Sequence, residues 1–529
     1  MMVLVVSQVR QAGLAGPVVS DWAVLELATA SASRGDQLLG PYSRFGWNHP
    51  GPFLFYWNAP FWAATGRQLG GLTLAAAVLN TLTLTTLVTV AGRISGRFAS
   101  WCAAGTVLVL FTRYDIERMR EAWNPNLTVT TTALAIALAI AVAAGHRRAL
   151  PLLALTASAT VQIHVGTLPT VALAVIAALT IALTADRSNL RRWIRPALAT
   201  IAILAVLWAL PAIEQHRGPE GNLTELSAFI TDGTTTGQSS ADASRAIAKL
   251  LAAQDPNFAD FSVLADLSAG DVVAVAGLLV VLLGGALLAV ARRDRTLLAW
   301  TTIPLLGIAG AHISATAIDG QLQAYLLAFV TGTALAAWTA AGVVVITVAS
   351  RARRDGAPRQ QQCSPSQPPV AASPNPLAAA LVAVAAGAGA FATIAPAAGA
   401  EPAVEQRPSP EAVALLPALR ATVAAADADV VLLRIGAHDL WTVTAPLVDA
   451  LEDDGIDARV DPAWSFLFGD QHEADGDEDL VVSVLPTTDA ASLRSLAMID
   501  EFNGVTLAIA STVAAPTELG PATAEAGGG

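Results

Sequence analysis

Long apolar runs, separated by short polar stretches, recur along the chain between residues 71 and 397. A helix that crosses a bilayer needs about 20 apolar residues, with a range of about 17–25. The runs therefore predict membrane-spanning helices, although some are short, and the pair 149–185 can also be interpreted as one helical hairpin around Gly166 and Pro169. The predicted spans are 71–92, 99–112, 126–145, 149–164, 167–185, 197–213, 271–291, 297–317, 321–349 and 376–397.

The positions of basic residues orient these spans. They gather in every second connection, and cytoplasmic loops of membrane proteins carry an excess of Lys and Arg. The connections predicted to be cytoplasmic contain Arg93 and Arg97, His146 to Arg148, Arg187 to Arg195, Arg292 to Arg295, and Arg351 to Arg359. The segments predicted to lie outside are 7–70, 113–125, 214–270 and 400–529.

An outside N-terminal segment needs a helix before it, and Met1 to Val6 is too short to span. We therefore expect the first helix to be truncated and the true start to lie upstream. A signal peptide is disfavoured, because the apolar stretch is short and no clear cleavage site follows it.

After the spans up to residue 350, the pattern changes twice. Residues 351–375 are rich in Pro, Ser and Gln, which predicts a disordered cytoplasmic linker before the last span. Strand and helix patterns then alternate, which predicts a small α/β domain over 400–520 and a disordered tail at 521–529. The predicted elements are strands at 430–435, 456–460, 479–485 and 505–509, and a helix at 439–451. The expected fold class is mainly α: a polytopic membrane helical bundle over 1–350 with a C-terminal α/β domain.

Composition supports this division. Hydrophobic residues make up 54% of the chain and charged residues 14%, whereas a soluble domain carries about 25% charged residues. From Glu401 to Gly529 there are 23 acidic and 5 basic residues, against 19 acidic and 25 basic in the remainder. An acidic tail on a mildly basic body argues against a nucleic-acid partner.

Cys102 and Cys363 predict no disulfide. The single lysine, Lys249, hints at a GC-rich bacterial source.

The first predicted outer loop carries the most informative polar pattern. Asp21 opens a helical pattern in which Trp22, Leu25 and Leu27 are apolar and Glu26 lies on another face. Next come Gly40, Tyr42, Arg44 and Trp47, and then the rigid turn His49-Pro50-Gly51-Pro52. The aromatic stretch 53–62 contains Asn58 and Pro60, so it predicts a helix lying in the membrane interface.

This layout resembles the GT-C glycosyltransferases, among them protein mannosyltransferases, aminoarabinose transferases and actinobacterial arabinofuranosyltransferases. The resemblance covers about residues 15–215, and the multi-span pattern extends it to about 350. It implies inverting transfer of a sugar from a polyprenyl-phosphate donor, with Asp21 as the general base. Many members have two adjacent acidic residues here, whereas this chain has Asp21 followed by Trp22. The alternative is that Asp21 only caps a helix, which is worth about 1 kcal/mol.

Other polar residues of the predicted outer face are further site candidates. Arginine suits a phosphate leaving group because its planar fork pairs with phosphate oxygens, although Glu117 and Glu121 could instead pair locally with the arginines of the second loop. Polar residues inside a span are candidates for function or for helix–helix hydrogen bonds. The candidates are Asp115, Glu26 and His49 for the acceptor or a second acidic site, Arg44, Arg113, Arg118 and Arg120 for the donor phosphate, and Gln162, His164, His312, Gln321 and Tyr325 for the donor cavity.

Two other polar segments are long or charged enough to suggest a function. The long loop 214–270 suggests acceptor recognition, because long ordered loops usually have a function. The acidic stretch Asp470 to Asp479 lacks the spacing of a calcium loop, so it is interpreted as a solvated turn.

The expected function is therefore a bacterial inner-membrane glycosyltransferase that acts on the outer face upon an envelope glycan, lipid or protein. Walker, dinucleotide and HExxH motifs are absent from the sequence, so no cofactor is implied, and a divalent metal is left open. The rival hypotheses are a transporter or flippase of lipid-linked precursors, and a non-catalytic envelope scaffold. A transporter is disfavoured because internal repeats and charged spans are not seen. A scaffold is disfavoured because an anchor does not need the aromatic first loop.

Overall fold

The computed structural model describes residues 20–113, 118–217, 221–231, 237–252, 267–355, 409–490 and 496–510. The chain forms two compact units. The membrane unit comprises 1–15 and 28–403, and the C-terminal unit comprises 16–27 and 404–529. Helix α2 (Ser20–Arg34) runs from the second unit into the first. The predicted truncated first helix, most of the linker, the last span at 376–397 and the tail at 521–529 lie outside the described residues.

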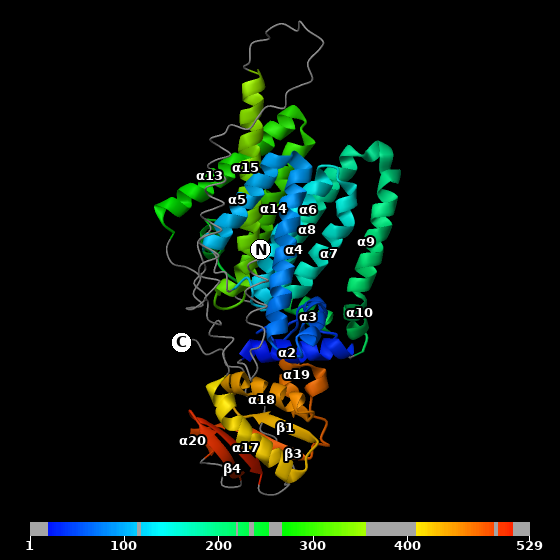
Figure 1. Ribbon diagram of the computed structural model, residues 1–529. Helices are drawn as coiled ribbons and strands as arrows, with labels where there is room; N and C mark the ends of the chain where they lie inside the picture. The colour runs from blue at the N-terminus through cyan, green and yellow to red at the C-terminus, as the bar shows by residue number, and fades with distance from the viewer. Residues whose placement is uncertain are drawn as a thin grey trace. The chain divides into compact units, whose positions relative to one another are not determined.

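Long helices make up the membrane unit (Figure 1). Within the described residues, α4, α6, α8, α13, α14 and α15 belong to six segments long and apolar enough to cross a membrane, and the bent pair 187–207 and 209–215 would make a seventh. Helices α5 and α7 match predicted spans but have only 17 and 14 residues. The helices are α4 (Gly70–Ser95), α5 (Arg97–Arg113), α6 (Asn124–Ala143), α7 (Leu150–Ile163), α8 (Leu168–Ala185), α9 (Ile194–Leu207), α10 (Ala209–Gln215), α13 (Ala269–Arg292), α14 (Arg295–Thr316) and α15 (Ala328–Asp355).

Helix α6 is the centre of this bundle. All of its residues are buried, and it packs against α4, α7, α8, α14 and α15. Small residues allow the close approach: a Cβ atom on Gly332 of α15 would collide with the carbonyl of Val129 on α6. Helix α9, in contrast, has no buried residue. The membrane unit is therefore organised around one fully enclosed helix.

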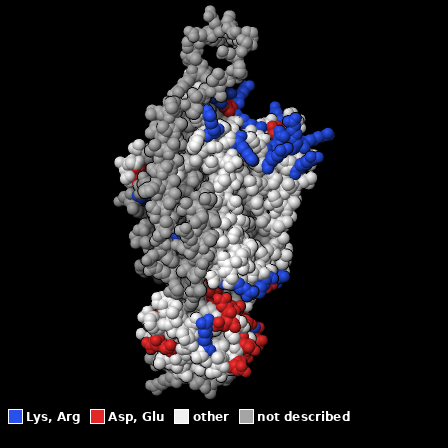
Figure 2. Space-filling view, in the orientation of Figure 1, with Lys and Arg blue, Asp and Glu red and all other residues white. Residues whose placement is uncertain are grey.

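Basic side chains gather mainly at one end of the helical bundle (Figure 2). Asp186, which follows α8, joins three elements there. Its carboxylate accepts hydrogen bonds from Nε of Arg147, Nη1 of Arg295 and Nε1 of Trp193, each at 3.1 Å. The desolvation cost of Asp186 is outweighed by these arginine and indole hydrogen bonds, so the pKa of its carboxyl is lowered. The connections expected to be cytoplasmic from their basic residues are thus tied together at this basic end.

Shorter helices cover the opposite end of the bundle. Helix α3 (Phe53–Ala64) forms where the aromatic stretch predicted an interfacial helix. Helices α11 (Asn222–Thr231) and α12 (Ser240–Leu251) form within the long loop 214–270. One face of α12 packs through Ile247 and Leu250 against the cluster that includes Phe329 of α15.

The C-terminal unit contains a five-stranded mixed sheet in the order β2-β1-β3-β5-β4. Strand β1 pairs in parallel with β2 and β3, and β5 pairs antiparallel with β3 and β4. The fully buried core includes Val431, Leu433, Val482 and Leu507. The elements are α17 (Pro410–Ala426), β1 (Val430–Ile435), α18 (Trp441–Asp453), β2 (Asp457–Val460), α19 (Ser465–Phe468), β3 (Leu480–Pro486), β4 (Leu496–Phe502) and β5 (Val505–Ala510). The predicted α/β character is confirmed, while α17 and β4 were not predicted.

Candidate functional site

The connection between α2 and α3 folds back on itself at the opposite end of the bundle. Tyr42 and Asn48 form an antiparallel bridge, and the amide of His49 donates to the carbonyl of Pro41 at 2.8 Å. Gly40 lies against this turn so closely that a Cβ atom there would stand 2.7 Å from the carbonyl oxygen of Gly51. Glycine at position 40 therefore lets the His-Pro-Gly-Pro turn fold tightly.

Asn222, the first residue of α11, holds this connection in place. The backbone amide of Asn48 donates to Oδ1 of Asn222 at 2.8 Å, and Nδ2 of Asn222 donates to the carbonyl of Asn48 at 2.9 Å. The backbone amide of Asn222 in turn donates to Oε1 of Glu214 at 3.0 Å. Sequence reasoning missed this pair, because one asparagine in a long polar loop gives no signal of its own.

Arg44 joins the same connection to the segment between α14 and α15. Its guanidinium donates to Oε1 of Gln323 at 2.6 Å and to the carbonyls of Asp319 and Gln321 at 3.1 and 3.0 Å. The predicted cavity residue Gln321 is therefore engaged here through its backbone. Phosphate binding by Arg44 stays a prediction, and it would require these three bonds to be shared or released.

His49 and His164 lie side by side with ring centroids 4.5 Å apart. His164 follows the end of α7 in extended conformation, so it lies in a break between α7 and α8, where the hairpin interpretation placed the turn. Nδ1 of His49 accepts from the amide of Val165 at 3.3 Å, and Nδ1 of His164 accepts from the amide of Gly166 at 3.2 Å. Burial, and then the His164 ring, lower the pKa of His49 well below its usual value.

The side chain of Gln162, a predicted residue of the donor cavity, connects helix α7 to α3 and α9. Its Oε1 accepts from the amide of Phe53 at 3.3 Å, and its Nε2 donates to the carbonyl of Leu207 at 2.8 Å. The side chain also lies where a Cβ atom of Gly51 would be. A role of Gln162 in a donor cavity stays a prediction, beside this structural one.

The second loop carries buried polar residues next to α6. Arg120 is 2% exposed and Arg118 is half-buried. Glu121 accepts a hydrogen bond from Nδ2 of Asn126 at 2.5 Å. The candidate Asp115 and the side chain of Arg113 lie outside the described residues.

Two remaining cavity candidates contact neighbouring segments. The ring of Tyr325 packs against Trp123 at 5.3 Å between centroids. Nε2 of His312 lies 3.2 Å from Oγ of Ser240 at the start of α12. Both residues are therefore in contact with the loops of the opposite end, as expected from their places near helix ends.

Asp21 and Glu26 lie in the part of α2 that belongs to the C-terminal unit, whereas the other described candidates belong to the membrane unit. Asp21 is half-buried in the first turn of α2. The expectation that Glu26 lies on a different face from the apolar residues is incomplete, because Glu26 is 8% exposed and buried like Trp22 and Leu25. Burial first, and then the carboxylates of Glu26, Asp453 and Glu452, raise the pKa of Asp449 on α18 well above its usual value.

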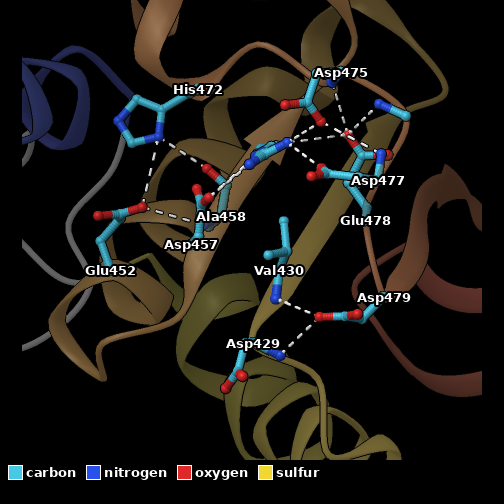
Figure 3. A network of polar contacts seen from close by, with 12 residues as sticks. Asp429, Val430, Glu452, Asp457, Ala458, His472, Asp475, Asp477, Glu478 and Asp479 are labelled. Carbon is cyan, nitrogen blue, oxygen red and sulfur yellow. Dashed lines mark hydrogen bonds and ion pairs between the residues drawn. The ribbon is translucent and has the colours of Figure 1, made fainter.

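The acidic stretch of the C-terminal unit surrounds one arginine (Figure 3). The guanidinium of Arg459 pairs with Asp475, with Asp457 at 2.9 Å and with Asp477 at 2.8 Å. Oxygens of Asp475, Asp477 and Glu478 lie within 4.8 Å of one another, a spacing that a metal ion could also use. Because Arg459 already supplies the positive charge, the stretch is an ordered ion-pair network and not merely a solvated turn.

The fold resembles that of known proteins over its whole length. ArnT from Cupriavidus metallidurans superposes with a TM-score of 0.55 at 14% identity, covering 97% of this chain and 98% of that one, in a crystal structure with bound undecaprenyl phosphate. Its apo crystal structure gives a TM-score of 0.53 at 14% identity and 95% coverage of each chain. No family model and no curated protein matches the sequence. The chain therefore shares the overall fold of ArnT, with membrane-length helices and a small C-terminal sheet, which is the mainly α fold class expected from the sequence.

Proposed function

We propose that this protein is a membrane glycosyltransferase that moves a sugar from a polyprenyl-phosphate donor to an envelope glycan, lipid or protein. The observation that carries the proposal is the full-length likeness to ArnT, which extends over both the helical bundle and the C-terminal unit. The undecaprenyl phosphate bound to ArnT indicates the class of donor. The loops gathered around Arg44, His49 and Asn222 supply an ordered polar end for such a site.

In this proposal Asp21 is the general base. It takes the proton of the acceptor hydroxyl as that oxygen attacks the anomeric carbon, and polyprenyl phosphate leaves. A positioned carboxylate contributes about 10²–10⁴-fold to such a step. A single displacement inverts the configuration of the anomeric carbon. The half-buried place of Asp21 in the first turn of α2 is compatible with this role.

The proposed location is the bacterial inner membrane, with the basic end of the bundle in the cytoplasm. The positive-inside rule supports this orientation, because basic side chains gather at that end. The opposite end, with the candidate site, and the C-terminal unit then lie outside the cytoplasm.

The test is transfer of radiolabel from polyprenyl-phosphate mannose and polyprenyl-phosphate arabinose in membranes that contain the full chain. Wild type is compared with Asp21→Asn and with a matched control, Asp242→Asn, which changes another carboxylate in the first turn of a helix. We expect protein-dependent transfer that falls by about 10²-fold or more in Asp21→Asn and is retained in the control.

Each result separates the hypotheses. Asparagine caps helices about as well as aspartate, so a mere capping role for Asp21 predicts full transfer in Asp21→Asn. No transfer from any polyprenyl-phosphate sugar in wild type contradicts the enzyme and favours the transporter or scaffold hypothesis.

A further inference from the structure

Three aromatic rings with N–H groups lie in series beside the α7–α8 break. Trp47 and His49 come from the connection between α2 and α3, and His164 comes from the break. The ring centroids of Trp47 and His49 are 5.6 Å apart, and those of His49 and His164 are 4.5 Å apart. All three side chains are more than nine-tenths buried, with exposed fractions of 7%, 4% and 7%.

Hydrogen bonds from the backbone determine which nitrogen of each imidazole carries the proton. Nδ1 of each ring accepts a hydrogen bond from the backbone, His49 from Val165 and His164 from Gly166. A neutral imidazole that accepts at Nδ1 carries its proton at Nε2. Since the lowered pKa keeps His49 neutral at physiological pH, this ring is a hydrogen-bond donor and is unsuited to act as a base or to bind a metal through Nε2.

One donor of this cluster lacks an acceptor within the described part of the chain. Nε1 of Trp47 is buried without a hydrogen-bond partner there, and the hydrogen bonds of His49 and His164 involve their Nδ1 atoms. A buried donor without an acceptor costs about 1–3 kcal/mol. Two other indoles of the unit have acceptors: Nε1 of Trp57 donates to the carbonyl of Ala75 at 3.0 Å, and Nε1 of Trp208 donates to Oγ of Ser158 at 3.1 Å. Nε1 of Trp47 is thus a buried donor that an oxygen atom of a ligand would satisfy.

The arrangement around the rings holds these donors rigidly. Asn48, between Trp47 and His49, is fixed on both sides of its peptide by Asn222. Phe229 of α11 packs on Trp47 with centroids 5.4 Å apart. Positioned donors favour a bound ligand over bulk water, because little ordering is needed when the ligand arrives.

We propose that Trp47, His49 and His164 bind the oxygen atoms of a neutral sugar, through its hydroxyl or ring oxygens. Sugar oxygens accept hydrogen bonds, and the sugar's C–H surface suits contact with aromatic rings. A protonated amino group has no lone pair and only donates, so the cluster selects against an amino group at the positions it contacts. The inference rests on the proposed function for its choice of lipid-linked sugars.

The decisive variant is Trp47→Phe, which keeps an aromatic ring but removes the indole N–H group together with the five-membered ring that carries it. Binding is measured as the thermal stabilisation of the purified full chain in lipid nanodiscs. The probes are polyprenyl-phosphate mannose, polyprenyl-phosphate arabinose, polyprenyl phosphate without sugar, and free methyl mannoside. The matched control is Trp57→Phe, which removes an indole N–H that has an acceptor.

We expect Trp47→Phe to lose some stability through the buried ring volume that it removes, offset in part because a buried donor without a partner is removed as well. Its affinity for a sugar-bearing ligand should fall about five- to tenfold, with binding of polyprenyl phosphate unchanged. Trp57→Phe removes the same part of an indole ring but also a hydrogen-bonded N–H group, so its affinity for the sugar should stay unchanged while its stability falls.

Three results would overturn the inference. One is equal weakening of polyprenyl phosphate and of its sugar conjugates, which would make the cluster a phosphate site. Another is unchanged sugar affinity in Trp47→Phe. The third is a wild type that binds neither lipid-linked sugar nor methyl mannoside. Sugar binding that depends on Trp47, in a protein that transfers no sugar, would support the inference and refute the proposed function.

Discussion

Asn222 pairs with the backbone of Asn48 as if it were a neighbouring β-strand. Its Oδ1 accepts the amide hydrogen of Asn48 and its Nδ2 donates to the Asn48 carbonyl, at 2.8 and 2.9 Å. The side-chain amide of Asn222 thus pairs with both backbone polar groups of Asn48, a buried residue that is 7% exposed. Because buried backbone groups must be paired, Asn222 fixes the turn that presents Trp47 and His49.

We predict that Asn222→Ala destabilises the membrane unit by about 1–3 kcal/mol for each buried group left without a partner. The thermal unfolding midpoint in nanodiscs measures this loss, and sugar transfer should fall with it. Asn189→Ala, at an exposed position between α8 and α9, is the control and should leave both unchanged. Equal midpoints for wild type and Asn222→Ala would show that the pair does not hold the turn.

We predict that Gly40→Ala disrupts the His-Pro-Gly-Pro turn. The added methyl group would lie 2.7 Å from the carbonyl oxygen of Gly51 and closer still to that of His49, so the backbone must shift. Transfer should drop more than tenfold, because catalytic geometry is sensitive to displacements of about 1 Å. Gly105→Ala on α5 is the matched control: no atom lies within 4 Å of its added methyl group, so activity should be retained. Full activity in Gly40→Ala would contradict the importance of the tight turn.

We predict that Arg459→Met makes the stability of the C-terminal unit dependent on calcium. Removing the guanidinium leaves Asp475, Asp477 and Glu478 close together without their positive partner, so their charges repel. Thermal unfolding should occur at lower temperature in EDTA and recover in millimolar Ca²⁺, because oxygen ligands suit this ion. Arg420→Met removes an arginine paired with Asp454 and should show no such recovery. A variant insensitive to both EDTA and Ca²⁺ would rule out this account of Arg459.

We predict that the C-terminal unit becomes less stable toward unfolding as pH rises, because the carboxyl group of Asp449 then loses its proton. Its pKa in the folded protein is raised by burial and then by Glu26, so folding favours the protonated form. The stabilising effect is complete below the unfolded pKa of about 3.9 and is lost as pH rises through the folded pKa. Asp449→Asn should therefore be more stable than wild type at pH 7 and similar at pH 4, as measured by thermal unfolding. The exposed neighbour Asp453, changed to Asn, should give a smaller effect. If the unfolding midpoints of wild type and Asp449→Asn change equally with pH, the predicted loss of stability on ionisation of Asp449 is wrong.

Much of the fold could be predicted because its elements bury continuous apolar runs. Strand β1 was predicted at its observed bounds, and the span predicted at 126–145 corresponds to α6, Asn124–Ala143. Strand β4 was missed because it is an edge strand without a buried side chain, stabilised by backbone pairing with β5. Such pairing leaves no hydrophobic pattern in the sequence. Helix α17 was missed in an alanine-rich stretch interrupted by Pro417.

The candidate site was harder to predict because its contacts join distant segments. Sequence reasoning selected His49 and His164 separately, on motif and on polarity, and only the fold shows that their rings are neighbours. Asn48 and Asn222 are 174 residues apart, and no local pattern could pair them. Arg44 was selected for its charge, but its hydrogen-bond partners are set by the path of the chain between α14 and α15. The chemistry of a residue type was visible in the sequence, whereas its partners were not.

The complete enclosure of α6 has a consequence for how the protein is made. During synthesis α6 enters the bilayer before α7, α8, α14 and α15 exist, so its surface must first be acceptable to lipid. Later the same surface must exchange lipid for protein on every side. Alanine and threonine, which recur from Thr128 to Ala143, suit both stages: they are tolerated in lipid, and their small size lets neighbouring backbones approach. Biogenesis, as much as final stability, thus explains why the centre of this bundle is built from small side chains.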